Sequence, residues 1–259
     1  DLDALAEVLD ERTAVVSVML VNNETGIVQP LAAVAELVRA RAPRAVLHTD
    51  AVQAPQWLDL RAATAPADLV ALSGHKFGGP KGAGVLVARG EVPLVPLVEG
   101  GGHERGLRSG THNVPGIVGF GLAAELAQVA LPSEARRLAA LRDAIAAGVR
   151  ACAPEAVVFG EGAERLSNTL CFAVPGLRAE TALIALDLDG VAVSSGAACA
   201  SGKVSRSGVL AAMGVDPALS AGALRVSLGW NSRECDGERF LAAFERLVSS
   251  LYKRRERAA

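Results

Sequence analysis

The sequence predicts an α/β protein whose first domain is built on a mainly parallel β-sheet. Apolar, β-branched runs alternate with segments whose apolar residues recur at helical spacing, and strands separated by helices are typical of such sheets. The chain has 259 residues, 51% of them hydrophobic, which is enough for one large core or two modest domains. We place a domain boundary near Leu131 and Pro132, which gives a large domain over residues 1–131 and a smaller C-terminal α+β domain over residues 132–259.

The elements of the large domain follow in order along the chain. Strands are expected at residues 13–21, 45–48, 69–72 and 85–88. The helix between the first two strands is expected at residues 30–41, because Pro30 suits a first helical turn and apolar residues follow at helical spacing. In parallel sheets of this kind, ligands bind beyond the carboxyl ends of the strands.

The pattern changes after residue 114 to long helices and short strands. Pro132 separates two predicted helices, residues 115–129 and 133–151, and Ser133 is the expected N-cap of the second. Further helices are expected at residues 180–188, 207–213 and 233–252, and strands at residues 157–159, 168–174, 191–194 and 224–228.

Composition narrows the class of protein. The net charge of -2 gives no reason to expect nucleic acid or an anionic membrane as a partner. No uninterrupted apolar run approaches the ~20 residues of a membrane span, and no signal peptide is visible, so the cytoplasm is the expected location. No two cysteines form a CxxC pair, so neither a metal site nor a disulfide scaffold is expected.

Lys76 comes shortly after the apolar strand expected at residues 69–72. An ammonium group is seldom fully buried, so this is an unusual place for a lysine with a purely structural role. It is either a surface lysine at the start of a loop or a lysine that forms a Schiff base. The glycine-rich stretch after it lacks the adjacent Gly-Lys-Ser/Thr of a phosphate loop. Ser73 and His75 flank Lys76 and are suitable donors for a phosphate group.

Asp50 ends another strand, in the stretch HTDAVQ, with Gln53 close behind it. It is either a helix N-cap or a carboxylate that faces the ring nitrogen of pyridoxal phosphate and keeps it protonated. Because Asp50 and Lys76 both end strands of one parallel sheet, they are expected to face the same crevice.

Cys199 lies among small residues, in the stretch SSGAACASGK, which is too poor in apolar area to pack as a core. It is either an incidental surface thiol or a nucleophile on a movable loop. Arg225 interrupts an apolar strand, so it needs an anionic partner, which is either an internal carboxylate or that of a substrate. The glycine-rich stretch of residues 99–116 is either a dimer contact or a connector.

Taken together, these motifs closely resemble those of the cysteine desulfurases of the class V aminotransferase group, of the NifS/IscS type. The resemblance covers nearly the whole chain and rests on six stretches in family order: VNNETGIVQP, HTDAVQ, SGHKFGGPKGAG, GGGHERGLRSGT, AVSSGAACASG and LRVSLG. It implies the type I fold of pyridoxal-phosphate-dependent transferases, with pyridoxal 5'-phosphate as cofactor and L-cysteine as substrate.

The resemblance also implies a role for each candidate residue. Lys76 would bind the cofactor as a Schiff base, Asp50 and Gln53 would contact its ring, and Ser73, His75 and Thr111 its phosphate, with Thr111 reaching across a homodimer. Asn23 is also implied in the cofactor site, and with Arg225 it would hold the substrate carboxylate. Cys199 would take the sulfur as a persulfide, release alanine, and pass sulfur to a carrier or scaffold protein for iron–sulfur cluster assembly or tRNA thiolation. His75 and Lys76 would join Cys199 in catalysis.

Three alternatives stay open: a selenocysteine lyase, an aminotransferase of the same class, or a chain that acts only as a binding partner. The family's N-terminal third, with a small-residue turn and a histidine that contact the cofactor, has no counterpart here. We therefore expect this chain alone to bind the cofactor weakly, to leave a sheet edge and apolar surface uncovered, and to aggregate readily. Trp230 stands where many members of this family have a charged residue. It lies beyond Arg225 in the sequence, so this difference does not change the expected function.

Overall fold

The chain divides into two compact units in the computed structural model, which describes residues 1–196 and 207–258. Residues 1–21 and 29–131 form the first unit, and residues 22–28 join the residues from 132 onward in the second. The expected large domain of residues 1–131 therefore lacks residues 22–28. These residues pair with the second unit, where Val28 N–H donates to Glu164 O at 2.8 Å and Leu166 N–H to Gly26 O at 2.9 Å.

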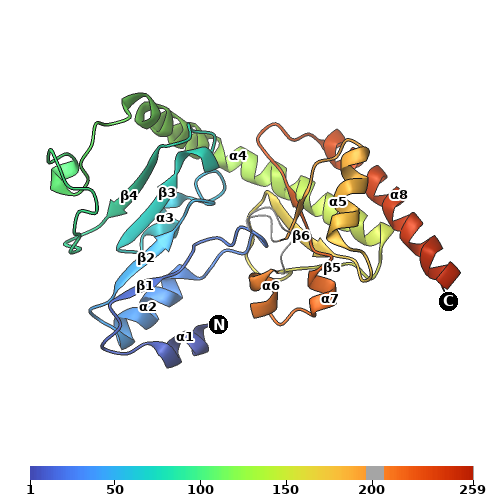
Figure 1. Cartoon of the computed structure of the whole chain (residues 1–259), viewed down its shortest axis with the longest axis horizontal. Coiled ribbons are helices and arrows are strands. Elements are labelled where there is room, and N and C mark those ends of the chain that lie inside the picture. The colour runs from blue at the N-terminus through green and yellow to red at the C-terminus, as the bar shows by residue number, and fades with distance from the viewer. Residues whose placement is uncertain (197–206, 259) are drawn as a thin grey trace. The chain divides into compact units, whose positions relative to one another are not determined.

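The first unit is built on a four-stranded sheet with the order β1-β2-β3-β4 (Figure 1). Its strands are β1 (Val15–Ser17), β2 (Val46–Asp50), β3 (Leu69–Ser73) and β4 (Gly84–Ala88). The β1–β2 and β2–β3 pairs are parallel, as expected, but β4 is antiparallel to β3. The connection of residues 74–83 is too short for the crossover that a parallel neighbour needs, so β4 returns as the second arm of a hairpin.

One predicted helix and two helices that the sequence did not indicate belong to this unit. They are α2 (Leu31–Arg41), α1 (Leu2–Val8) and α3 (Leu60–Thr64). Leu31, Val34, Ala35 and Val38 form the buried face of α2. The strand residues Leu47 and Val70 are 0% and 2% exposed, so apolar burial fixes the centre of the sheet.

Much of β4 is uncovered. All five of its residues are exposed, including Val85 at 39%, Leu86 at 50% and Val87 at 37%. The chain then leaves β4 as a long loop that contains the short helix η2 (Glu104–Gly106) before the next helix begins (Figure 1). The family resemblance led us to expect uncovered apolar surface on this sheet. An exposed apolar strand such as β4 favours association between molecules.

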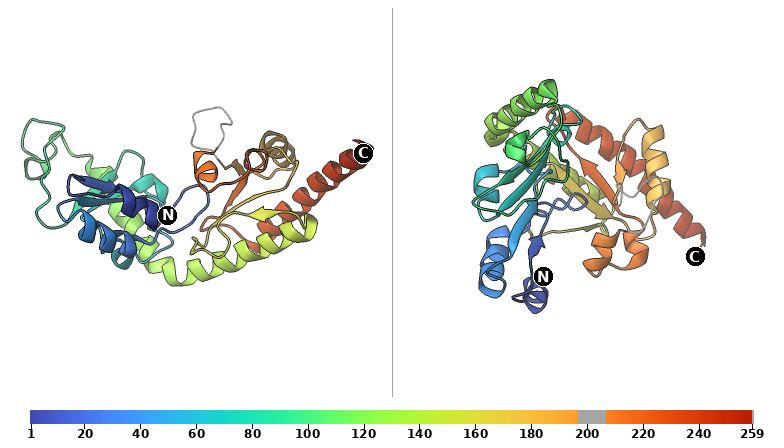
Figure 2. Two further views of the ribbon diagram at one scale, coloured as in Figure 1. Left: turned by 90° about the horizontal axis from the view of Figure 1, so that it is seen from below. Right: turned by 60° about the vertical axis from the view of Figure 1, so that its left-hand side comes forward.

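The helix α4 (Val114–Cys152) is continuous, whereas two helices separated at Pro132 were predicted (Figure 2). Pro132 lies inside it, flanked by long alanine-rich stretches that favour helix on both sides. By length and composition alone α4 is apolar enough to cross a membrane, which the search for uninterrupted apolar runs missed. The most apolar window of α4 is only 11% buried, whereas Leu138, Ile145 and Val149 in its second half are buried.

The second unit contains an antiparallel sheet with the order β5-β6-β8-β7. Its strands are β5 (Val157–Val158), β6 (Thr169–Ala173), β7 (Ser194–Ser195) and β8 (Leu224–Ser227), and its helices are α5 (Ala179–Leu188), α6 (Gly208–Ala212), α7 (Pro217–Ser220) and α8 (Glu234–Ala258). The short α7 was not predicted. All of β6 is buried, and Phe172 on it packs edge-on against Phe244 of α8, with ring centroids 5.5 Å apart.

Candidate functional site

The predicted site residues fall into two groups, one in each unit. The first unit holds Asp50, Gln53, Ser73, His75, Lys76 and Thr111, and the second holds Asn23 and Arg225. Cys199 lies outside the described residues, so nothing tests its predicted place.

Two neighbouring strands bring the first group together at one edge of the sheet. β2 and β3 run parallel, and Asp50, the last residue of β2, is paired in register with Ala71. The chain is held there by a hydrogen bond of 3.0 Å from Ala51 N–H to Ala71 O. β3 continues through Ser73 into the turn that carries His75 and Lys76. β2 and β3 are therefore parallel neighbours, as expected, while the expectation that Asp50 and Lys76 face the same crevice stays a prediction.

Asp50 does not cap a helix. Its Oδ1 accepts a hydrogen bond of 3.0 Å from Val52 N–H, which closes the turn after β2. Its Oδ2 has no hydrogen-bond partner in the part of the chain that the structure describes. Gln53 lies in the same turn and is half-buried. The carboxylate is thus held at the strand end by one oxygen, while the other is available to a protonated ring nitrogen.

The turn after β3 presents Lys76 to solvent on a rigid base. Gly74–Lys76 form the short 3₁₀ helix η1, and Gly74 O accepts from Phe77 N–H at 3.1 Å. Phe77 is only 3% exposed and packs edge-on against Phe120, with ring centroids 5.1 Å apart. Lys76 itself is exposed, and within the described residues it forms no ion pair. An anchored backbone with an unpaired amine suits a lysine that has to react.

Ser73 and His75 form a polar pair beside that lysine. Ser73 Oγ lies 2.9 Å from His75 Nδ1, and the imidazole is exposed. A hydroxyl and an imidazole so close together can both donate to one phosphate group. With the carboxylate of Asp50 and the amine of Lys76, this donor set fits pyridoxal phosphate: a phosphate end, a ring-nitrogen partner and a nucleophilic amine.

Thr111 is in the same unit but is exposed at the end of the loop that follows β4. This loop is held in part by an ion pair in which His112 Nε2 lies 3.1 Å from Glu104 Oε1. Glu104 and Arg105 have φ values of 50° and 59°, in the left-handed region that costs energy for residues other than glycine. The loop therefore has a defined turn, and Thr111 is accessible to another molecule.

Arg225 is the centre of the second group. Its Nη1 donates to Asn23 O at 2.7 Å, and its Nη2 lies 3.5 Å from Ser194 Oγ. Its Nε is buried without a hydrogen-bond partner, and no carboxylate among residues 1–196 and 207–253 forms an ion pair with it. The internal salt bridge considered as an alternative is therefore absent from the described part, which leaves the guanidinium able to take a carboxylate from outside.

Cys171 lies next to Arg225 in the sheet of the second unit. It is fully buried on β6, opposite Arg225 of β8. Burial raises the pKa of Cys171 to about 12, with Glu24 adding to the rise and Arg225 opposing it. A thiol so strongly protonated is not a nucleophile at neutral pH, so Cys171 is a core residue.

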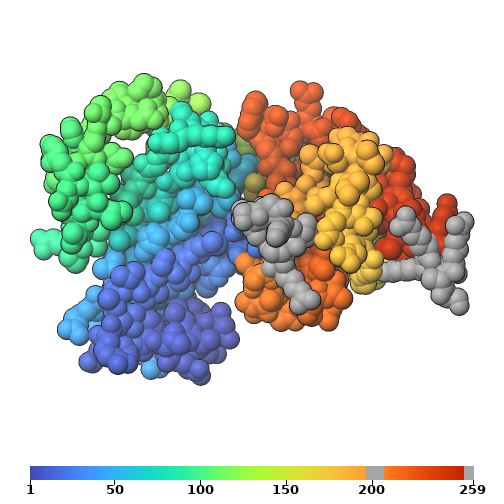
Figure 3. Space-filling view, viewed as in Figure 1, coloured from blue at the N-terminus to red at the C-terminus, as the bar shows by residue number. Residues whose placement is uncertain are grey.

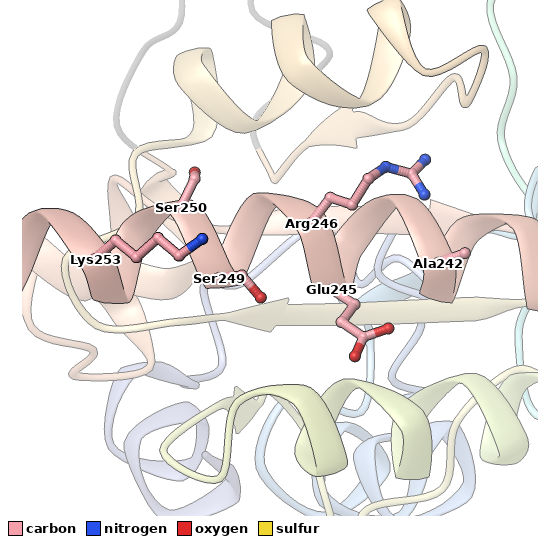
Figure 4. A pocket seen from close by; sticks show the side chains of 6 residues that line it. All are labelled: Ala242, Glu245, Arg246, Ser249, Ser250 and Lys253. Atoms are coloured by element: carbon pink, nitrogen blue, oxygen red, sulfur yellow. The ribbon is translucent and has the colours of Figure 1, made fainter.

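A hollow lies along α8, and none of the predicted residues lines it. It is lined by Ala242, Glu245, Arg246, Ser249, Ser250 and Lys253. Figure 4 shows Arg246 and Ser250 on one side of the helix, and Glu245 and Ser249 on the other. Arg246 is already paired with Asp189 at 3.0 Å. These side chains do not converge on one point, so we do not assign a site there.

Three polar residues near Arg225 were missed by the sequence analysis as parts of the site: Glu24, Ser194 and Ser207. Glu24 accepts a hydrogen bond from Ser207 Oγ, although 183 residues separate the two in the chain. Ser194 was recognised only as the end of a strand, and Ser207 only as the start of a helix. Glu24 stands next to Asn23 in the stretch NNETG, which was the one local signal available.

Comparison with known proteins places this geometry in a family. The model of the aminotransferase class-V family matches residues 1–240. A cysteine desulfurase of Cereibacter sphaeroides is 43% identical over 251 residues, which cover 97% of this chain and 64% of the relative. The chain thus spans about two thirds or slightly less of the curated relatives it matches.

Two solved structures are similar in the same way. A NifS-like protein superposes with a TM-score of 0.87 at 36% identity, over 96% of this chain and 65% of that one. A structure described as SspA in complex with cysteine has a TM-score of 0.69 at 30% identity, over 88% of this chain and 62% of that one. These matches confirm the predicted resemblance and the predicted fold. The chain belongs to the aminotransferase class-V family.

Proposed function

We propose that the protein carrying this chain is a cysteine desulfurase, which removes sulfur from L-cysteine, releases L-alanine and holds the sulfur as a persulfide on Cys199. One observation carries the proposal: Asp50, the Ser73–His75 pair and Lys76 follow two adjacent parallel strands at one sheet edge. That is the donor set for pyridoxal phosphate, the cofactor of class V aminotransferases and cysteine desulfurases.

Pyridoxal phosphate, when bound, supplies an electron sink for the amino acid. Lys76 would hold it covalently through its amine, Asp50 would keep the ring nitrogen protonated, and Gln53 would contact the ring. Ser73, His75 and Thr111 would bind the phosphate. Each of these roles uses a group that the described structure leaves accessible or half-buried.

The substrate would be oriented by Arg225 and Asn23. The guanidinium of Arg225 binds the carboxylate of L-cysteine, and the turn at Asn23 keeps the guanidinium in place through the 2.7 Å hydrogen bond. The Cys199 thiolate then forms an S–S bond with the substrate sulfur as the Cβ–S bond breaks. The electron pair left on carbon takes up a proton, giving alanine, and Cys199 carries the sulfur. One structural neighbour, SspA, was solved in complex with cysteine, which supports this choice of substrate.

The persulfide is a transferable product, so we propose an acceptor protein that uses it for iron–sulfur cluster assembly or tRNA thiolation. We also propose a homodimer. Its support is a row of exposed apolar residues in the first half of α4: Val114, Ile117, Val118, Leu122, Leu126 and Val129. Figure 3 shows the start of α4 and the loop before it, in green, at the outside of the first unit. We propose the cytoplasm as location, which suits the free thiols of Cys152, Cys171 and Cys235.

Peptide mass spectrometry after addition of L-cysteine and pyridoxal phosphate tests the activity. We expect alanine to form together with a sulfur adduct on the peptide that contains Cys199, and both to disappear in Cys199→Ser. An aminotransferase would keep its activity in that variant, and a selenocysteine lyase would turn over selenocysteine but little cysteine. Alanine without an adduct on Cys199 would contradict the proposed mechanism.

A further inference from the structure

Glu24 has no role in the function proposed above, yet it sits in a tightly fixed turn. Asn22 Oδ1 accepts hydrogen bonds from Glu24 N–H at 3.0 Å, Thr25 N–H at 2.9 Å and Thr25 Oγ at 3.0 Å. Gly26 closes the turn with φ 75°, and a Cβ there would lie 2.9 Å from Thr169 Cβ on β6. The turn is therefore locked both internally and against the sheet, which fixes the direction of the Glu24 side chain.

The carboxylate of Glu24 is hydrogen-bonded to the residue that follows segment 197–206, which includes Cys199, and lies near the residue that precedes it. Ser207 Oγ donates to Glu24 Oε2 and accepts from Leu210 N–H at 3.0 Å, so it links the carboxylate to the start of α6. On the other side, a Cβ built on Gly196 would lie 3.9 Å from the same Oε2. Gly196 N–H is held by Ala223 O at 3.0 Å. The residues that precede and follow 197–206 are thus neighbours of one carboxylate.

The same turn also holds Arg225. Asn23 O accepts from its Nη1 at 2.7 Å, and Ser194, two residues before Gly196, approaches its Nη2 at 3.5 Å. The charges of Glu24 and Arg225 both reach Cys171 and act on its pKa in opposite directions. Residues 22–26 therefore contact both the guanidinium of Arg225 and Ser207 at the start of α6.

We propose that Glu24 is a positioning residue for sulfur transfer, which fixes Ser207, the residue that follows the Cys199 segment, relative to Arg225. This inference rests on the proposed desulfurase function. Cys199 stands three residues after Gly196 and eight before Ser207 in the sequence. Transfer between two groups depends steeply on their placement, and a shift of about 1 Å costs on the order of 100-fold in rate.

A single-turnover experiment on the protein loaded with pyridoxal phosphate tests this. Peptide mass spectrometry gives the rate at which the sulfur adduct forms on Cys199. The change in cofactor absorbance gives the affinity for L-cysteine. We expect Glu24→Ala to slow the adduct by at least about tenfold while half-saturation by cysteine changes less than about twofold. Glu24→Gln keeps an acceptor for Ser207 and should recover most of the rate. Glu164→Ala, an exposed acid of the same unit, serves as the matched control and should behave as the unaltered protein.

A double-mutant cycle assigns the effect to the contact itself. Ser207→Ala should slow the adduct as Glu24→Ala does, and the double variant should be no slower than Glu24→Ala. If Glu24→Ala loses the cofactor band, Ser207→Ala and Glu24→Gln decide the question by the same readouts. Unchanged adduct rates in the two alanine variants, or additive effects in the cycle, would overturn the role of Glu24 alone. No Cys199 adduct in the unaltered protein would overturn the proposed function and this inference with it.

Discussion

Gly74, at the start of the lysine turn, permits a sharp test of how that turn is built. A Cβ at Gly74 would lie 3.0 Å from Phe120 Cδ2, 3.2 Å from Ala83 O and 3.2 Å from Pro80 O. Two of these three neighbours are backbone atoms, which yield little, so Gly74→Ala should overpack the turn. The expected cost is about 1–3 kcal/mol in the free energy of unfolding of the first unit. Because the same shift displaces Lys76, cofactor binding should weaken in parallel.

The chain supplies a matched control and its own probe. Gly121→Ala makes the same chemical change inside α4, where a Cβ meets nothing within 4 Å, so it should stabilise by about 0.5–1 kcal/mol. Trp57 is 9% exposed in the first unit, whereas Trp230 is 74% exposed in the second. With Trp230→Phe as background, Trp57 fluorescence reports unfolding of the first unit alone.

Urea titration with this probe gives the answer. At a slope of about 2 kcal/mol per M, Gly74→Ala should lower the midpoint by about 0.5–1.5 M and Gly121→Ala should raise it slightly. Equal midpoints for Gly74→Ala and the background, with unchanged cofactor binding, would refute the claim that close packing at Gly74 shapes the turn.

Three further outcomes are expected. Cys171, whose pKa is raised to about 12, should resist alkylation at pH 8 in the native protein while the exposed Cys235 reacts; early labelling of Cys171 would contradict its burial. Because Cys171 holds its proton more tightly when folded, its contribution to stability should fall as pH rises from about 9 toward 12, and Cys171→Ala should lack this loss. Arg225→Gln should weaken L-cysteine binding about 10- to 100-fold, read from cofactor absorbance, and unchanged affinity would argue against carboxylate capture. Leu86→Lys on the uncovered β4 should slow self-association, measured by light scattering. An equal rate of association in the variant and the unaltered protein would show that another surface drives association.

The parts of the site that could be predicted are those with local signals. Asp50 and Lys76 each come a few residues after an apolar run, and polar residues at the end of a buried strand stand out in sequence. Parallel topology then puts both at one edge, and the observed register of β2 and β3 agrees.

What could not be predicted depends on distant contacts or on local rules that the fold overrides. The Glu24–Ser207 hydrogen bond joins residues 183 apart in the chain, and no pattern of apolar residues in the sequence predicts it. Residues 22–28 look like a plain loop in the sequence, and contacts with distant residues, such as Glu164 and Leu166, place them in the second unit. Pro132 normally ends a helix, but the strong helix formers on both sides and the burial of α4 farther along outweigh one lost hydrogen bond.

The visible spectrum of the protein with pyridoxal phosphate, with and without Lys76→Ala, is the decisive test of how the cofactor is attached. We expect an absorption band from the Schiff base that depends on Lys76 and shifts when L-cysteine is added. Asn168→Ala, which alters a residue of the second unit whose amide donates to Leu228 O, should leave the band in place. A band of equal strength in Lys76→Ala would contradict the assignment of Lys76 as the residue that binds the cofactor.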